Sequence, residues 1–75
     1  MTSAADVKSW IENGMTATEV DVVGDGRHFE ARIVASEFSG KNSLQRQRMV
    51  YKALGEHMHS DVHAITLKTL SPEEV

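Results

Sequence analysis

The sequence predicts a small α+β domain whose elements follow the order α-β-β-α-β. Residues 44–58 carry apolar side chains at helical spacing, residues 28–36 alternate between apolar and polar side chains, and Gly24-Asp25-Gly26 is a strong turn signal between two strand-like runs. Because the second and third strands are joined through a helix, we expect them to be parallel neighbours in a mixed three-stranded sheet. Both main helices should pack on one face of that sheet.

The first helix and the hairpin are predicted from end signals and side-chain spacing. Ser3 with Asp6 three residues later is typical of a helix start, and Gly14 is a plausible stop. Residues 19–23 alternate and are β-branched, as strands often are. Residues 28–36 place their apolar side chains on one face, which should be the buried face of an antiparallel hairpin.

A long helix is predicted over residues 44–54, after a turn at residues 38–40. Asn42 and Gln45 have the spacing of a capping box. Gln47 falls inside the apolar arc, where we expect an edge position with a hydrogen bond, the alternative being a role in a site. The arc itself spans about 120° and comprises Leu44, Val50, Tyr51, Leu54 and Met58.

The remaining residues predict a connection, a strand and a helix start. Residues 56–61 are polar and predict a short loop with His57 and His59 solvated. Residues 63–69 alternate as a third strand. Residues 71–74 have the cap, the proline and the acids of a helix start, but we expect that helix to be barely formed.

Size and composition limit the function classes. The 75 residues should form one domain, residues 1–75, and a net charge of −3 argues against broad binding to phosphate backbones. There is no cysteine, so any thiolate in a metal site must come from a partner. No apolar run approaches the length of a membrane span, and no secretory signal is recognisable, so we expect a cytoplasmic protein without membrane contact.

Two histidines are the candidate metal ligands. His28 opens the second predicted strand and His63 the third, and parallel neighbours about 4.8 Å apart would place both at one end of the sheet. Two neutral imidazoles are half of a site for iron, zinc or copper. Strand alternation puts His28 on the polar face and His63 on the apolar face, so one ring must turn at its strand end. The alternative is two ordinary polar residues at strand ends.

No catalytic constellation is recognisable, so an enzyme is not expected. There is no cysteine nucleophile, and no serine has the context of a nucleophile elbow. Nucleic-acid binding is the other alternative, because the element order is shared with KH-type RNA-binding folds, although Gly40 is not followed by the GxxG loop of that class. A small basic stripe could serve it, or could simply be a solvated helix face: Lys41, Arg46, Arg48 and Lys52.

Three segments together resemble the BolA-like proteins. They are the hairpin GDGRHF, the turn and helix EFSGKNSLQRQRMVYKAL, and the ending VHAITLKTLSPEE. The resemblance covers about Val20 to Glu74 and is greatest to the bacterial members that carry a GDGxHF hairpin. It implies a class II KH-like fold without the GxxG loop, which agrees with the absence of that loop here.

The resemblance also implies a partner and a cargo. BolA-like proteins form heterodimers with monothiol (CGFS-type) glutaredoxins, in which a 2Fe–2S cluster is shared with the glutaredoxin cysteine and a glutathione thiol. His63 matches the family histidine before the third strand, and His28 matches the variable ligand of the hairpin. The expected function is to bind, transfer or sense such a cluster in iron homeostasis. We expect no cofactor on the isolated chain, which would be a monomer or a weak homodimer.

A second function is implied by other members of the family. Some BolA-like proteins are associated with DNA binding and with stress responses. The turn and the long helix would then act as a helix-turn-helix reader through the basic stripe of Lys41, Arg46, Arg48 and Lys52. The acidic net charge argues against this alternative.

Overall fold

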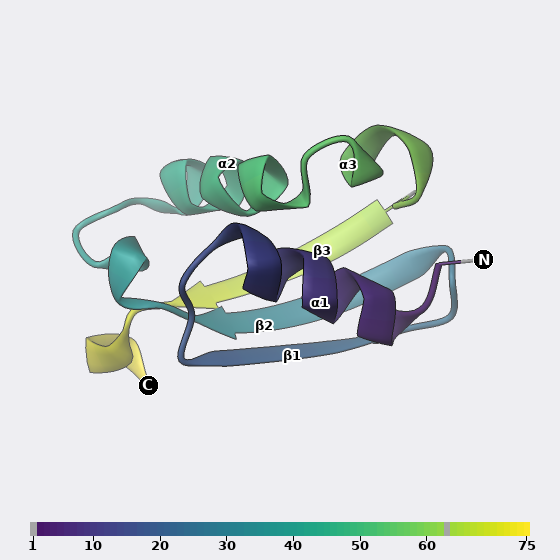
Figure 1. The fold of residues 1–75 in the computed structure, drawn as a ribbon. Helices are drawn as coiled ribbons and strands as arrows, with labels where there is room; N and C mark the ends of the chain where they lie inside the picture. Colours follow the sequence, from purple (N-terminus) through teal and green to yellow (C-terminus); the bar gives the residue numbers. More distant parts are fainter. Residues whose placement is uncertain (1, 63) are drawn as a thin grey trace.

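The computed structural model describes residues 2–62 and 64–75 and has the predicted α+β architecture. Figure 1 shows α1 and α2 over the same face of a three-stranded sheet. The capping boxes predicted at Ser3 and Asn42 are both present, with Asp6 and Gln45 as their reciprocal partners. The elements are α1 (Ala4–Gly14), β1 (Glu19–Gly24), β2 (His28–Val34), η1 (Ser36–Phe38), α2 (Ser43–Leu54), α3 (His57–Ser60), β3 (Ala64–Leu70) and η2 (Pro72–Glu74).

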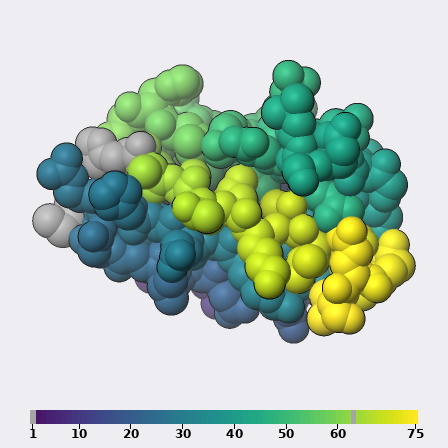
Figure 2. Space-filling model, turned by 180° about the vertical axis from the view of Figure 1, so that it is seen from behind, coloured from purple at the N-terminus to yellow at the C-terminus, as the bar shows by residue number. Residues whose placement is uncertain are grey.

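The sheet has the order β1-β2-β3, with β2 in the middle. β1 and β2 form the predicted antiparallel hairpin, in which Glu19 lies opposite Val34. β2 and β3 are parallel, and their register sets His28 opposite Ala64 and Val34 opposite Leu70. The prediction of a mixed sheet with a helical crossover is therefore confirmed. Figure 2 shows the opposite side of the molecule, where β3 runs across the surface with α2 beside it.

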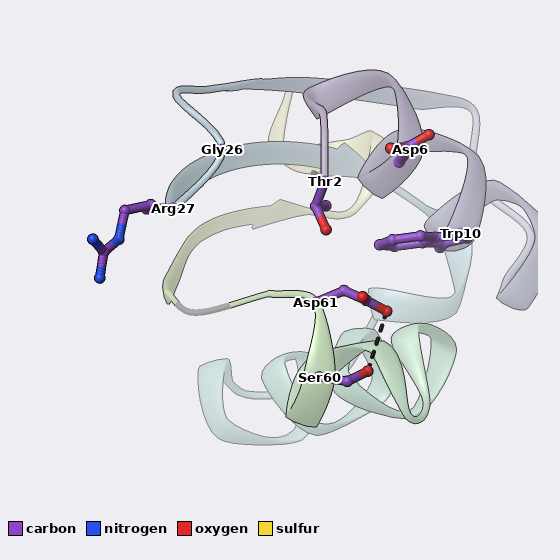
Figure 3. Close-up of a pocket in the computed structure, with 7 residues that line it drawn as sticks. All are labelled: Thr2, Asp6, Trp10, Gly26, Arg27, Ser60 and Asp61. Carbon is purple, nitrogen blue, oxygen red and sulfur yellow. Dashed lines mark hydrogen bonds between the residues drawn. The ribbon is translucent and has the colours of Figure 1, made fainter.

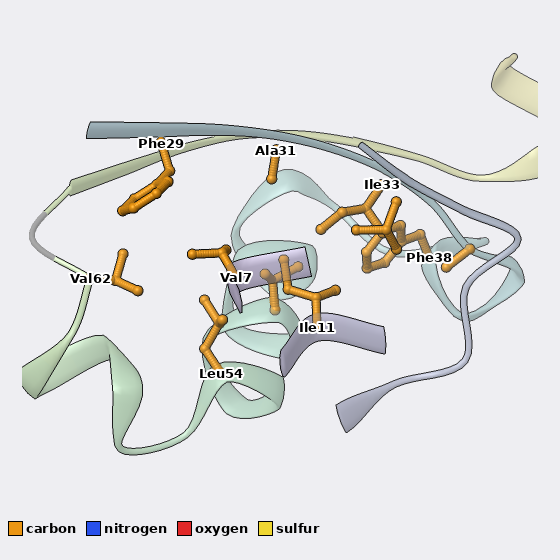
Figure 4. Packing of buried hydrophobic residues seen from close by; sticks show 11 residues of the cluster. Val7, Ile11, Phe29, Ala31, Ile33, Phe38, Leu54 and Val62 are labelled. Atoms are coloured by element: carbon orange, nitrogen blue, oxygen red, sulfur yellow. The ribbon is translucent and has the colours of Figure 1, made fainter. Parts of the chain in front are cut away.

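The hydrophobic core lies between the sheet and the two longer helices. β2 supplies alternate buried side chains, as its pattern predicted, and Val7 and Ile11 of α1 are fully buried against them (Figure 4). The apolar arc predicted for α2 is wrong at Leu44, whose exposed fraction is 54%. The buried stripe of α2 instead follows four-residue spacing through Arg46, Val50 and Leu54, which turns Leu44 toward solvent.

Two short segments differ from their predictions. Residues 56–61 are not a loop, because His57–Ser60 forms the helix α3. The strand predicted to reach Ser36 ends at Val34, and Ser36–Phe38 forms the 3₁₀ helix η1, after which the predicted turn follows at residues 39–40. The expected short ending is present as η2, which is a single 3₁₀ turn. None of the helices in the part of the chain that the structure describes is long and apolar enough to cross a membrane.

Candidate metal-ligand rim

The first residues of β2 and β3 lie side by side at one end of the sheet, which we call the rim. His28 is the register partner of Ala64, and the Ala64 amide donates to the Arg27 carbonyl oxygen at 3.2 Å. The predicted adjacency of the two strand starts is therefore confirmed. His63 precedes Ala64 in the sequence and lies outside the described residues, so the meeting of the His28 and His63 rings stays a prediction.

The hairpin turn before His28 is held by one carboxylate. The Asp25 Oδ1 atom accepts from the amides of Arg27 and His28, each at 2.9 Å. Gly26 supplies the positive φ of 99° that the turn requires. The donated hydrogen bonds, that of His28 first and that of Arg27 second, lower the pKa of Asp25. The charged carboxylate of Asp25 therefore fixes the position of the His28 backbone at the start of β2.

The side chain of His28 is available to a ligand. It is exposed, and within residues 2–62 and 64–75 no hydrogen bond engages its ring nitrogens. In the same described ranges no three His, Cys, Asp or Glu side chains gather as a metal site. An exposed imidazole is a side chain that iron, zinc or copper can bind, and a metal held at the rim would need further ligands from a second molecule.

A hollow of about 600 Å³ lies beside the hairpin. It brings together the first turns of α1, the hairpin turn and the end of α3, and Figure 3 shows Arg27 pointing away from its centre. Its lining joins one aromatic ring to polar and charged groups: Thr2, Asp6, Trp10, Gly26, Arg27, Ser60 and Asp61. The hollow therefore adjoins the hairpin turn that leads into the rim, and three separate segments border it.

The prediction that His57 is a solvated loop residue is wrong. Its ring stacks on Trp10 with 3.6 Å between ring centroids and 4° between planes. Its Nδ1 atom lies 2.6 Å from Asp61 Oδ2, and the hydrogen bond from His57 lowers the pKa of Asp61. These contacts attach α3 to α1, whereas His59 is exposed as predicted. The four-residue spacing of His57 and Asp61 is a sequence signal for their contact on a helix. No pattern in the sequence indicates that His57 would stack on Trp10.

The basic stripe is divided by the fold. Lys41, Arg48 and Lys52 are exposed, whereas Arg46 is buried. The prediction that places Arg46 in a basic nucleic-acid-binding stripe is therefore wrong for its position, because its side chain points inward from α2. A DNA reader built on α2 would have only the three exposed cations, on a chain of net charge −3.

Arg46 instead joins α2 to the end of the chain. Its Nε donates to the Phe38 carbonyl oxygen and its Nη1 to the Thr69 carbonyl oxygen, both at 3.1 Å. The guanidinium also forms two hydrogen bonds to Glu74, at 2.6 and 3.3 Å. This pair, followed by the Ser71 amide, lowers the pKa of Glu74 to about 2. Sequence reasoning missed this role because the partners of Arg46 come from three different elements.

The fold is that of a class II KH-like α+β domain in which the amino ends of two parallel strands lie side by side. The BolA-like protein family matches residues 7–74, which is most of the chain. The chain belongs to the BolA-like protein family.

Individual relatives agree with that membership. A BolA protein homologue from Coxiella burnetii has a TM-score of 0.91 and 48% identity, covering 99% of this chain and 96% of that one. The acid stress protein IbaG of Escherichia coli (strain K12) is 33% identical over 70 residues, which are 92% of this chain and 83% of that protein. The BolA domain of SufE1 from Arabidopsis thaliana has a TM-score of 0.84 and 26% identity, covering 96% and 94% of the two chains.

Proposed function

We propose that this chain partners a monothiol glutaredoxin and that the two proteins together bind a 2Fe–2S cluster for transfer or sensing. The observation that carries the proposal is the parallel register at the rim. It sets the exposed His28 beside Ala64, the residue that follows His63. Membership of the BolA-like family supports the same proposal.

The ligand chemistry follows from what the chain has and lacks. It has no cysteine, so the thiolates would come from the glutaredoxin and from glutathione, and the imidazoles from His28 and His63. Histidine ligation raises the reduction potential of a 2Fe–2S cluster relative to thiolate ligation. Because a ligating imidazole must be neutral, binding should weaken as the pH falls below about 6.5. Such a cluster suits transfer or sensing better than permanent structural use.

The hairpin would orient the ligand that it carries. Asp25 fixes the backbone of Arg27 and His28, whereas the His28 ring is free to meet an incoming metal. The recessed surface next to it offers room for an approaching protein loop. The chain's own contribution is therefore to present an imidazole on a fixed turn.

The test is a titration of glutathione-loaded holo-glutaredoxin with this chain, followed by visible absorption and circular dichroism. We expect new visible bands with the native chain, loss of those bands with His63→Ala, and a weaker or altered spectrum with His28→Ala. The control is His59→Ala, which removes an exposed imidazole from α3 and should leave the spectrum of the complex unchanged. An unchanged spectrum on adding the native chain would contradict the proposal.

A further inference from the structure

The positive charge of this chain is concentrated in one stretch that contains α2. Residues 38–55 hold none of the eleven Asp and Glu residues but half of the eight Lys and Arg residues: Lys41, Arg46, Arg48 and Lys52. Arg46 is paired with Glu74. Over residues 2–62 and 64–75, no ion pair engages the side chain of Arg48 or Lys52. α2 therefore presents two exposed cations that no acid of the described chain neutralises.

The exposed side of α2 lies opposite its buried stripe. Leu44, Arg48 and Lys52 are exposed and follow one another at four-residue spacing, which places their side chains along one side of the helix. Leu44 is 54% exposed, and among the helices of the described residues it is the only large hydrophobic residue in that state. We call these three residues the outer row of α2. The outer row combines one apolar side chain with two cations.

A groove of about 200 Å³ lies between α2 and β3, next to the outer row. Its lining comes from both elements: Ser43, Gln47, Tyr51, Ile65, Leu67 and Thr69. Ile65 and Leu67 are half-buried, and Gln47 Nε2 donates to the Tyr51 hydroxyl at 2.6 Å, which confirms the edge position predicted for Gln47. Figure 2 shows α2 beside β3 on this side of the molecule. Pockets for small-molecule ligands hold about 300–1,000 Å³, so this groove suits a single side chain.

We propose that this surface docks a segment of another protein in which acidic residues flank a large apolar side chain. The apolar side chain enters the groove over Ile65 and Leu67, beside Leu44, and the acids pair with Arg48 and Lys52. Opposite charges across an interface speed association and fix the orientation of the partner. The surface includes neither His28 nor a metal, so the inference goes beyond the proposed iron–sulfur function.

The charge distribution favours a short acidic protein segment over nucleic acid. Outside residues 38–55 the chain holds all eleven carboxylate side chains and only four cations. Exposed charges act over about 8 Å at physiological salt. A nucleic acid duplex that lies along α2 extends past the outer row and meets the acidic remainder, whereas a short segment meets the cations alone. The apolar floor of the groove also offers no hydrogen bond to a phosphate backbone.

The first test uses a fluorescein-labelled amphipathic peptide with leucine on one side and glutamate on the other, and measures fluorescence anisotropy. The native chain should bind it more tightly than the same peptide with lysine in place of glutamate. Arg48→Glu combined with Lys52→Glu should weaken binding about tenfold or more, because attraction becomes repulsion. The matched control combines Lys8→Glu with Lys68→Glu, which reverses two other exposed cations, on α1 and β3, and should bind the peptide as the native chain does.

The second test addresses the apolar part of the surface without changing its charge. Leu44→Gln keeps a good helix former at an exposed position, so the fold should be unchanged and the peptide should bind about threefold more weakly or worse. Val23→Thr is the control, because Val23 is 61% exposed on β1 and should not affect the peptide. In nitrogen-15 NMR spectra of the native chain, the peptide should shift the amide signals of residues 44–52, Ile65 and Leu67.

Four results would overturn the inference. The first is equal binding of the glutamate and lysine peptides, and the second is an equal loss in the two double variants. The third is tighter binding of a short DNA duplex than of the glutamate peptide at the same salt concentration, which would assign the surface to nucleic acid. The fourth is a shift of the same amides with the concentration of the native chain alone, which would assign it to a second copy. His28→Ala should bind the peptide normally, so this test is independent of the iron–sulfur proposal.

Discussion

The role of Arg46 in the structure differs from the role that its sequence context predicts. In the sequence it is one of several cations near Arg48, and these suggest a solvated or nucleic-acid-binding stripe. In the fold its guanidinium satisfies two backbone carbonyls and pairs with Glu74. A buried guanidinium is acceptable only with such partners, because an unpaired buried charge is costly. Arg46 therefore holds the segment after β3 against the start of α2.

Replacing Arg46 should test this structural role. We expect Arg46→Ala to lower the free energy of unfolding by about 1–3 kcal/mol, since it removes the donor to the Thr69 carbonyl and one of the two donors to the Phe38 carbonyl, the Lys41 amide being the other. Arg48→Ala, which removes an exposed cation from the same helix, should change it by less than about 0.5 kcal/mol. Urea unfolding followed by far-UV circular dichroism measures both. Equal effects of the two substitutions would show that Arg46 has no such role.

The helix α3 depends on tertiary contacts for its existence. Four residues are far too few for a helix that is stable alone. The stack of His57 on Trp10 and the bond from His57 to Asp61 supply the missing support. The amides of Asp61 and Val62 both donate to the His57 carbonyl, so His57 also anchors the segment that leads toward the rim.

Loss of the His57 ring should loosen this element without unfolding the domain. An aromatic pair is worth about 0.5–1.5 kcal/mol beyond its buried area, so His57→Ala should speed exchange of the Asp61 and Val62 amides by up to about tenfold. Trp10 is the only tryptophan, so its fluorescence reports the same change directly. His59→Ala is the control on the same helix. Identical exchange and fluorescence in the two variants would exclude the anchoring role of His57.

For the whole molecule, acid stability depends on three carboxylates at different places in the fold. Asp25 holds the hairpin turn, Asp61 pairs with His57, and Glu74 pairs with Arg46. Hydrogen bonds lower the pKa of each, to about 2 for Glu74. The folded state therefore binds fewer protons than the unfolded state in moderate acid.

The sign of the pH dependence follows from these depressed pKa values. The stabilisation is fully present above the ordinary values of 3.8 for Asp and 4.5 for Glu, and it is lost as the pH falls through the folded values toward about 2. We expect urea unfolding to show a stability that declines below about pH 4.5. Glu74→Gln should make that decline shallower. A native chain equally stable at pH 2.5 and pH 7 would contradict this.

The sequence by itself determined the order of the elements, both capping boxes, the hairpin and the parallel crossover. These features depend on the spacing of residues that are close in the sequence and on the fixed handedness of strand connections. Both can be inferred without knowledge of the tertiary packing. It also indicated which strand ends would meet, and the register of His28 with Ala64 confirms that adjacency. The pairing of the His28 and His63 rings remains a prediction.

Only the tertiary structure decided the burial of Arg46, the exposure of Leu44 and the formation of α3. Each depends on how a helix is rotated against the sheet or on a partner from a distant segment, as with His57 on Trp10. The edge position of β3 is likewise a tertiary property, because the strand order places β3 at one side of the sheet, where Arg46 donates to the Thr69 carbonyl. Sequence patterns indicate the periodicity of a single helix or strand, whereas the burial of Arg46, the exposure of Leu44 and the formation of α3 depend on packing between elements.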